Sequence, residues 1–169
     1  VPVFDSPAVP ARTAQADAPY VSAEQFSQLL SLLYEAAFTP EGWKPFLEAL
    51  RLQLGGNFAS LIVRPGNADD VGLIVSAAGD RKDLVTHAPK ISMSPFRGMP
   101  TDRIVTVGDV MPESEWRAST YYNDWCKQMQ VFHVLAADIV TKDACVYGLR
   151  VTRPEQAPVF TKQERAFGS

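Results

Sequence analysis

The chain has 169 residues, which fits one domain of ordinary size and is long enough to bury a core without disulfides or metals. Hydrophobic residues make up 46 % and charged residues 21 %, close to globular averages, which argues against wholesale disorder. The net charge of −3 argues against nucleic-acid binding by this segment, because neutralising phosphates takes an excess of basic side chains.

The two cysteines, Cys126 and Cys145, do not make a disulfide framework. Each lies in an apolar run, where a buried free thiol is the expected state, and this fits a reducing cytoplasm. No apolar run approaches the ~20 residues needed to span a bilayer. We therefore expect a cytoplasmic protein with no membrane partner.

Residues 1–21 are rich in Pro and Ala without a period, which predicts an extended arm or linker. Ser22 and Gln25 then form a capping-box signature at the start of a helix. Thr39-Pro40 is a second helix start, and Gly55-Gly56 ends that helix. Each helix carries one apolar stripe, which must be buried against the other helix, the sheet or a partner chain. The stripes are Phe26, Leu29, Leu30, Leu33 and Ala37, and Trp43, Phe46, Leu47, Leu50 and Leu54.

The period then changes to that of strands. Phe58–Val63 and Val71–Ala78 are rich in β-formers and are separated by turn residues, which predicts an antiparallel hairpin. A helix is predicted at about Lys82–His87, inside a proline-punctuated segment that is mostly loop. Ile104–Val107 is a short third strand.

Pro112 opens a helical segment that we expect in two pieces, followed by two strands and a new helix start at Thr161. The strands are Phe132–Val140 and Cys145–Thr152. On the helical segment, Tyr122, Trp125, Cys126 and Met129 are predicted to share one face. About five strands with helices before and between them predict a mixed α+β domain.

Motifs for metal binding and catalysis are missing from the sequence. His87 and His133 have no ligand-type neighbours at helix or strand spacing, so a structural or surface role is favoured over a metal site. No nucleophile–base signature occurs, and Glu113 and Glu115 point apart on a helix. We expect neither an enzyme nor a cofactor.

Five aromatic residues fall within the 17 residues from Trp116 to Phe132. Core packing explains such a cluster, because large aromatic side chains dominate core energetics. A small-molecule pocket explains it equally well, since pockets are apolar and aromatic with a few polar atoms, here from Ser60 and Asn123 among others. The candidate ligand-binding residues are Phe96, Met99, Tyr121, Tyr122, Trp125 and Phe132.

Several segments together resemble the N-terminal domains of LuxR-type helix-turn-helix regulators, over roughly residues 23 to 167. They are Leu29–Ala37, Thr39–Trp43, Phe46–Leu50, Gly55–Ser60, Glu115–Trp125, His133–Leu135, Leu149–Arg153 and Phe160–Glu164. The resemblance implies a GAF/PAS-like sensor domain, an antiparallel sheet of about five strands with helices on its faces. The expected organisation is an arm at 1–21, the sensor domain at 22–160 and the start of a linker helix at 161–169.

In such regulators a C-terminal helix-turn-helix binds DNA, and the resemblance implies that DNA is contacted only through that domain, which is absent here. The implied function is ligand sensing and dimerisation, with a small-molecule effector and a homodimer. The branch that binds acyl-homoserine lactones carries Trp and Tyr ahead of an Asp-Pro pair, and residues 83–96 have none of these. The alternatives are a stand-alone GAF-like domain with a cofactor-binding or enzymatic role, and a protein-interaction module with a filled core.

Overall fold

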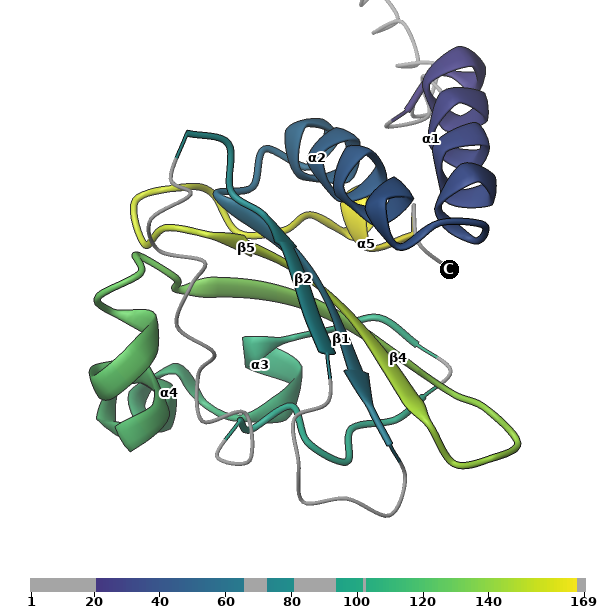
Figure 1. The fold of residues 1–169 in the computed structure, drawn as a ribbon. Helices are drawn as coiled ribbons and strands as arrows, with labels where there is room; N and C mark the ends of the chain where they lie inside the picture. The colour runs from purple at the N-terminus through teal and green to yellow at the C-terminus, as the bar shows by residue number, and fades with distance from the viewer. Residues whose placement is uncertain (1–20, 66–72, 81–93, 102, 167–169) are drawn as a thin grey trace, which may run out of the picture.

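A five-stranded antiparallel sheet forms the centre of the molecule (Figure 1). The computed structural model describes residues 21–65, 73–80, 94–101 and 103–166. The strand order is β2-β1-β5-β4-β3, and every neighbouring pair is antiparallel. The bounds are β1 Phe58–Arg64, β2 Leu73–Ala77, β3 Val105–Thr106, β4 His133–Val140 and β5 Val146–Arg153. The predicted α+β class with about five antiparallel strands is confirmed.

The first helix, α1 (Ala23–Ala36), starts at the predicted capping box. The Gln25 backbone N–H donates to Ser22 Oγ at 3.2 Å, and the Ser22 N–H donates to Gln25 Oε1 at 2.9 Å. Two of the free N–H groups at the helix start are thereby satisfied.

The second predicted helix begins differently from the expectation. Pro40–Gly42 form a turn of 3₁₀ helix (η1), and the α-helix proper, α2, runs from Trp43 to Gln53. Thr39 is the predicted cap, and its Oγ1 accepts from the Gly42 N–H at 3.2 Å. The chain leaves α2 through Gly55, whose φ of +55° is a conformation that glycine adopts without strain.

In the described part of the chain, four short helical pieces follow: α3 (Val107–Val110), α4 (Glu113–Ala118), the π-helix η4 (Tyr122–Cys126) and α5 (Lys162–Ala166). The two pieces expected after Pro112 are α4 and η4. The prediction that the third strand extends to Val107 was wrong, because Thr106 and Asp109 form a capping box that starts α3 at Val107. The predicted arm, the turn at 66–70 and the helix at 82–87 lie outside the described residues, apart from Val21.

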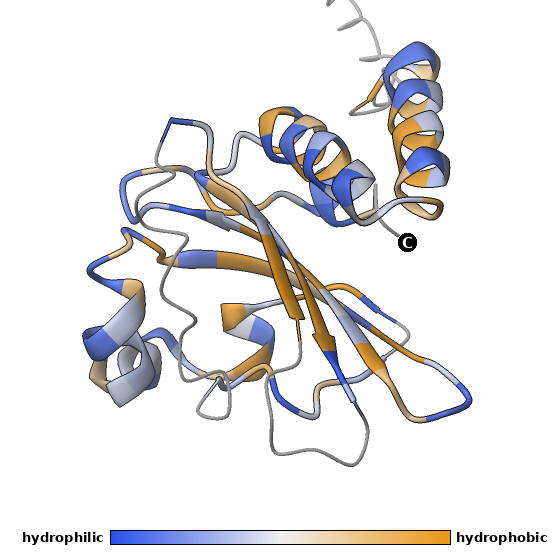
Figure 2. Cartoon of the chain, viewed as in Figure 1, coloured by the Kyte–Doolittle hydropathy of each residue, from blue (hydrophilic) through white to orange (hydrophobic). Residues whose placement is uncertain are grey.

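Helices cover both faces of the sheet, with α2 and α5 on one side and α3 and α4 on the other (Figure 1). We call these sides the α2 face and the α4 face. Each has its own buried cluster, because successive side chains of a strand point to opposite faces. On β1, for example, Ala59 and Leu61 belong to the cluster on the α2 face and Phe58 to the cluster on the α4 face. Figure 2 shows long hydrophobic stretches, in orange, in the strands.

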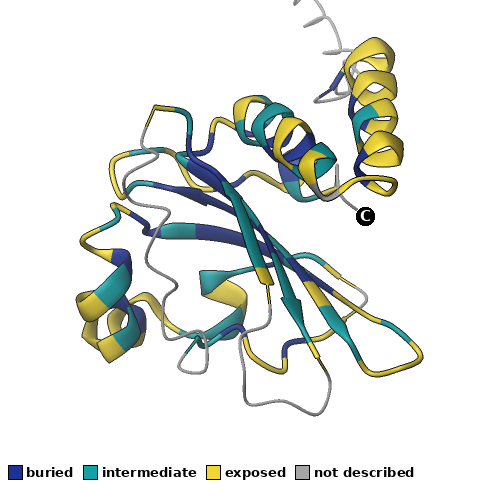
Figure 3. Cartoon of the chain, in the orientation of Figure 1, coloured by how far each residue is buried: buried dark blue, intermediate teal, exposed yellow. Residues whose placement is uncertain are grey.

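The apolar stripe of α1 is only partly buried, as its largely exposed surface in Figure 3 shows. Leu29 is 7 % exposed, whereas Phe26 is 46 %, Leu30 is 37 % and Leu33 is 38 % exposed. The helix packs mainly on α2. Among the described helices, none is long and apolar enough to cross a membrane.

Candidate functional site

The candidate ligand-binding residues gather on the α4 face. Phe96, Met99, Tyr122 and Phe132 are buried in one cluster there, and Tyr121 packs against it. They come from the loop before β3, from the segment around η4 and from the start of β4. The structure therefore brings five of the six predicted residues together.

Trp116 lies at the centre of this aromatic group, although it was not among the predicted ligand-binding residues. Its ring centroid is 5.3 Å from that of Tyr122 and 6.2 Å from that of Tyr121, and its side chain is fully buried. The indole Nε1 is buried without a hydrogen-bond partner in the described part of the chain. A buried donor without a partner costs free energy. The Trp116 N–H is therefore an unsatisfied polar group on the α4 face.

The prediction that Trp125 shares the buried face of Tyr122 and Cys126 was wrong. Trp125 is half-buried and lies outside the cluster. The cause is the π-helical turn, in which the Lys127 N–H donates to the Tyr122 carbonyl five residues back at 2.9 Å. The wider turn shifts side chains away from the spacing of an α-helix.

Asn123 is exposed, and its amide donates to the carbonyls of Arg117 and Ser119. The Asn123 amide is thus engaged with the local backbone. Ser60 does lie on the α4 face, and its hydroxyl is 2.8 Å from that of Ser76 on the paired strand.

Three charged side chains meet on the same face of the sheet, and none of them was predicted from the sequence to lie at the site. Asp138 of β4 lies 2.7 Å from Arg150 of β5 and 3.0 Å from Arg64 of β1. The sequence did contain a signal for this arrangement. Each of the three lies an even number of positions from a residue of the same strand that points to the α4 face. We call Arg64, Asp138 and Arg150 the charged trio.

Two titratable groups on the α4 face are neutral at physiological pH. Burial raises the pKa of the Tyr121 hydroxyl to about 12, and its hydroxyl is hydrogen-bonded to Ser94. Burial also raises the pKa of the Cys126 thiol to about 12. Both cysteines are free, and Cys145 is half-buried.

Metal ligation finds no support in the described residues, since no group of three His, Cys, Asp or Glu side chains occurs among them. His133 lies at the start of β4 with its ring against Phe132, centroid to centroid at 5.0 Å. His87 lies outside the described residues.

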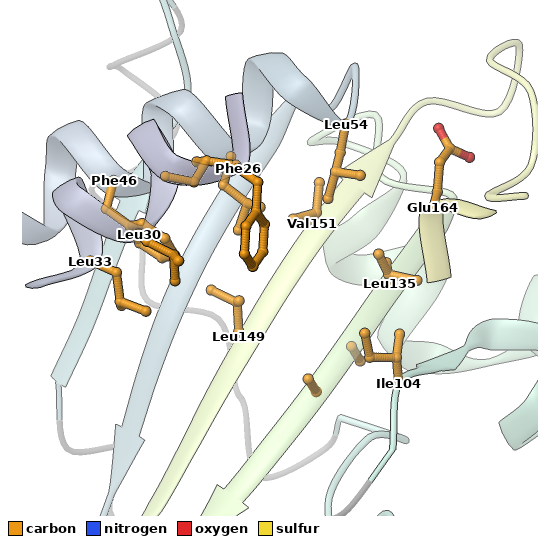
Figure 4. A pocket seen from close by; sticks show the side chains of 14 residues that line it. Phe26, Leu30, Leu33, Phe46, Leu54, Ile104, Leu135, Leu149, Val151 and Glu164 are labelled. Carbon is orange, nitrogen blue, oxygen red and sulfur yellow. The ribbon is translucent and has the colours of Figure 1, made fainter. Parts of the chain in front are cut away.

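A separate apolar cavity of about 190 Å³ lies on the α2 face, between α1, α2 and the strands β4 and β5 (Figure 4). Carbon lines almost all of it, and its one charged residue, Glu164, forms an ion pair with Arg153. A small-molecule site needs a few polar groups to fix the orientation of its ligand. This cavity is better suited to burying apolar side chains, and the labelled Phe26, Leu30 and Leu33 of α1 border it.

No protein-family model matches the sequence, and no curated protein is similar to it in sequence. Solved structures do match the fold. The ligand-binding domain of VqsR from Pseudomonas aeruginosa is similar with a TM-score of 0.61 at 14 % identity, covering 83 % of this chain and 85 % of that one. The LuxR-family transcription factor CepR2 from Burkholderia cenocepacia, which depends on N-acylhomoserine lactone, matches with a TM-score of 0.57 at 15 % identity, covering 86 % and 87 %.

SdiA from Escherichia coli matches with a TM-score of 0.56 at 10 % identity. The match covers 84 % of this chain and 61 % of the SdiA chain. A further match is SdiA in complex with octanoyl-rac-glycerol, with a TM-score of 0.53. The chain thus has the fold of the ligand-binding domains of LuxR-type regulators, and the resemblance in fold predicted from the sequence is confirmed.

Proposed function

We propose that this chain is the ligand-sensing domain of a LuxR-type transcription regulator. The observation that carries the proposal is the fold, which matches such domains over more than four fifths of this chain and of the VqsR and CepR2 chains. We also propose that the domain is of the GAF/PAS-like kind and that the protein is cytoplasmic. The free thiols support the cytoplasmic location.

The effector is a small organic molecule that binds on the α4 face. The support is the gathering of Phe96, Met99, Tyr121, Tyr122 and Phe132 there, beside polar groups such as Ser60 and the charged trio. Apolar walls with a few convergent polar groups are the usual composition of a ligand pocket.

Two of the fold neighbours depend on or were solved with acyl compounds, namely an N-acylhomoserine lactone for CepR2 and octanoyl-rac-glycerol for SdiA. Residues 83–96 of this chain lack the Trp, Tyr and Asp-Pro of the lactone-binding branch. We therefore propose an effector of another chemical class.

The regulator acts as a homodimer, and contacts DNA through a helix-turn-helix domain outside residues 1–169. The partly exposed stripe of α1 supports the dimer. The support for a further domain is that this chain matches only 61 % of the SdiA chain.

A thermal-shift screen tests the sensing function. A library that includes acyl lactones, acylglycerols and organic acids is expected to contain compounds that raise the melting temperature in a concentration-dependent way, because binding to the native state alone stabilises it. Tyr121→Ala is expected to abolish that shift, because Tyr121 is half-buried and packs against the cluster of proposed ligand-binding residues. Trp43→Ala is the matched control, since Trp43 is also half-buried but packs on the α2 face. A library in which no compound raises the melting temperature would count against a sensor.

A further inference from the structure

The charged trio is largely buried: Asp138 and Arg150 are buried, and Arg64 is half-buried. The side chain of Asp138 is 3 % exposed, that of Arg150 is 9 % and that of Arg64 is 14 %. The three come from adjacent strands, β4, β5 and β1, and all project from the α4 face. Buried charges are costly unless they are fully paired, so the pairing within the trio decides what it can do.

The trio carries one positive charge in excess. Arginine stays protonated in proteins, so two guanidinium groups face a single carboxylate. Across residues 21–65, 73–80, 94–101 and 103–166, no second carboxylate forms an ion pair with Arg64 or Arg150. Burial lowers the pKa of the Arg150 guanidinium, and repulsion from Arg64 lowers it further.

The hydrogen-bond donors of the two arginines are filled unequally. Nη1 of Arg150 donates to the carbonyls of Ala137 and Leu149 at 3.0 and 2.9 Å, which fixes its guanidinium against the sheet. Nε of Arg64 is buried and has no hydrogen-bond partner among the described residues. Oδ1 of Asp138 contacts Arg150 Nη2 at 2.7 Å as an ion pair but is not aligned for a hydrogen bond. Within the described part of the chain, the trio therefore has an excess positive charge and one hydrogen-bond donor without a partner.

Gly148 makes the room for this arrangement. It stands between Ile62 and Asp138 in the register of β1, β5 and β4. A Cβ atom there would lie 2.7 Å from Asp138 Oδ1 and 3.1 Å from Arg150 Nη1, so any other residue would displace the Asp138 carboxylate. The gap in the sheet surface at Gly148 is thus filled by the trio itself.

The trio borders two of the proposed ligand-binding residues. The Phe96 ring centroid lies 5.7 Å from Cζ of Arg150. Tyr121 is near enough to Arg150 for the guanidinium to act on the pKa of its hydroxyl. An apolar wall and a positive charge therefore lie side by side on the α4 face.

We propose, on the basis of the proposed sensing function, that the effector is an organic acid whose carboxylate pairs with Arg64 and Arg150. One carboxylate neutralises the excess charge, and it accepts the hydrogen bond for which Arg64 Nε has no partner among the described residues. Guanidinium groups suit this task because their planar donors match the two oxygens of a carboxylate. The apolar part of the acid packs against Phe96 and Tyr121.

The test compares acids with their neutral counterparts on the whole chain. The probes are octanoate and phenylacetate, each beside its own primary amide, and binding is measured by calorimetry and thermal shift. The acids are expected to bind about tenfold or more tightly than the amides, a difference equal to one charge-assisted hydrogen bond. Amides that bind as well as the acids, or acids that do not bind, would overturn the inference.

Arg64→Gln gives a second arm of the test, because it removes the excess charge and leaves Asp138 paired with Arg150. It is expected to weaken acid binding about tenfold while leaving amide binding unchanged. Arg103→Gln, which removes an exposed arginine, is the matched control and should keep the preference for acids. An unchanged preference in Arg64→Gln contradicts the proposal, and the wild-type comparison stands if that variant does not fold. Neutral hits from the screen with no acid binding would sink this inference and leave the sensing function intact.

Discussion

Trp116 and Trp125 differ in burial although both belong to the same aromatic segment. Trp116 is fully buried between Tyr121 and Tyr122, whereas Trp125 is half-buried outside the cluster. The stability of the domain should therefore depend on the first ring much more than on the second.

Trp116→Ala is expected to reduce the free energy of unfolding by about 3–5 kcal/mol, because it removes a large buried ring and leaves a cavity. Trp125→Ala should cost clearly less. Trp116→Phe should also cost less than Trp116→Ala, because it keeps most of the ring and removes a buried N–H that has no partner in the described part of the chain. Urea unfolding followed by circular dichroism measures all three. Equal costs for the two alanine variants would contradict the assignment of Trp116 to the core.

At this scale the sequence predicted the aromatic group but not its geometry. A spacing of 3.6 residues places Trp125 with Tyr122, and the π-helical turn, which no residue pattern announces, moves it away. The charged trio was missed for another reason. A charged residue in a strand is ordinarily assigned to solvent, and only the register of β1, β5 and β4 shows that Arg64, Arg150 and Asp138 meet.

Among the elements, α5 is fixed by one buried ion pair. Glu164 pairs with Arg153 of β5 and also accepts from the Thr161 N–H at 2.6 Å, closing a capping box with the Thr161 hydroxyl. Arg153 donates in turn to the Leu54 carbonyl at 3.0 Å, and its Cζ lies 4.1 Å from the Phe160 ring centroid. The pair thus joins α5, β5 and the end of α2.

Glu164→Ala is expected to destabilise the domain by about 3–5 kcal/mol, because it leaves the Arg153 charge buried without a carboxylate. The matched control is Glu113→Ala, which breaks the exposed pair with Arg117 and should cost at most about 1 kcal/mol. Thermal and urea unfolding of both variants provide the comparison. A cost for Glu164→Ala no larger than for Glu113→Ala would show that the buried pair does not hold α5.

Most elements were predictable because their signals are local. The caps at Ser22 and Thr39 and the glycines after α2 mark helix ends through their own backbone chemistry. The short helix α3 was not predicted, since four residues carry too little of a helical period to be distinguished from the end of a strand. The packing of α1 on α2, rather than on the sheet, could not be predicted from the sequence because it depends on tertiary contacts.

The whole molecule leaves an apolar surface uncovered along α1. Phe26, Leu30 and Leu33 are each more than a third exposed, and they border the cavity of about 190 Å³ on the α2 face (Figure 4). A helix stripe of this kind gains free energy when it is buried, at about 25 cal/mol per Å² of apolar surface. Pairing of two copies through their α1 helices is the simplest closed arrangement, since two-fold dimers are the commonest assembly.

Sedimentation velocity of the wild-type chain at about 100 μM is therefore expected to show a dimer, and the dimer should dissociate on dilution. Leu30→Asp places a charge in the centre of the stripe and should give a monomer at the same concentration. Ser31→Asp is the control, because Ser31 is an exposed neighbour on the same helix that lies outside the stripe, and it should leave the dimer intact. Circular dichroism at low concentration checks that Leu30→Asp keeps its fold, since Leu30 is already 37 % exposed in the single chain. A wild-type chain that sediments as a monomer throughout, or a folded Leu30→Asp variant that still dimerises, would show that the stripe on α1 is not the dimer interface.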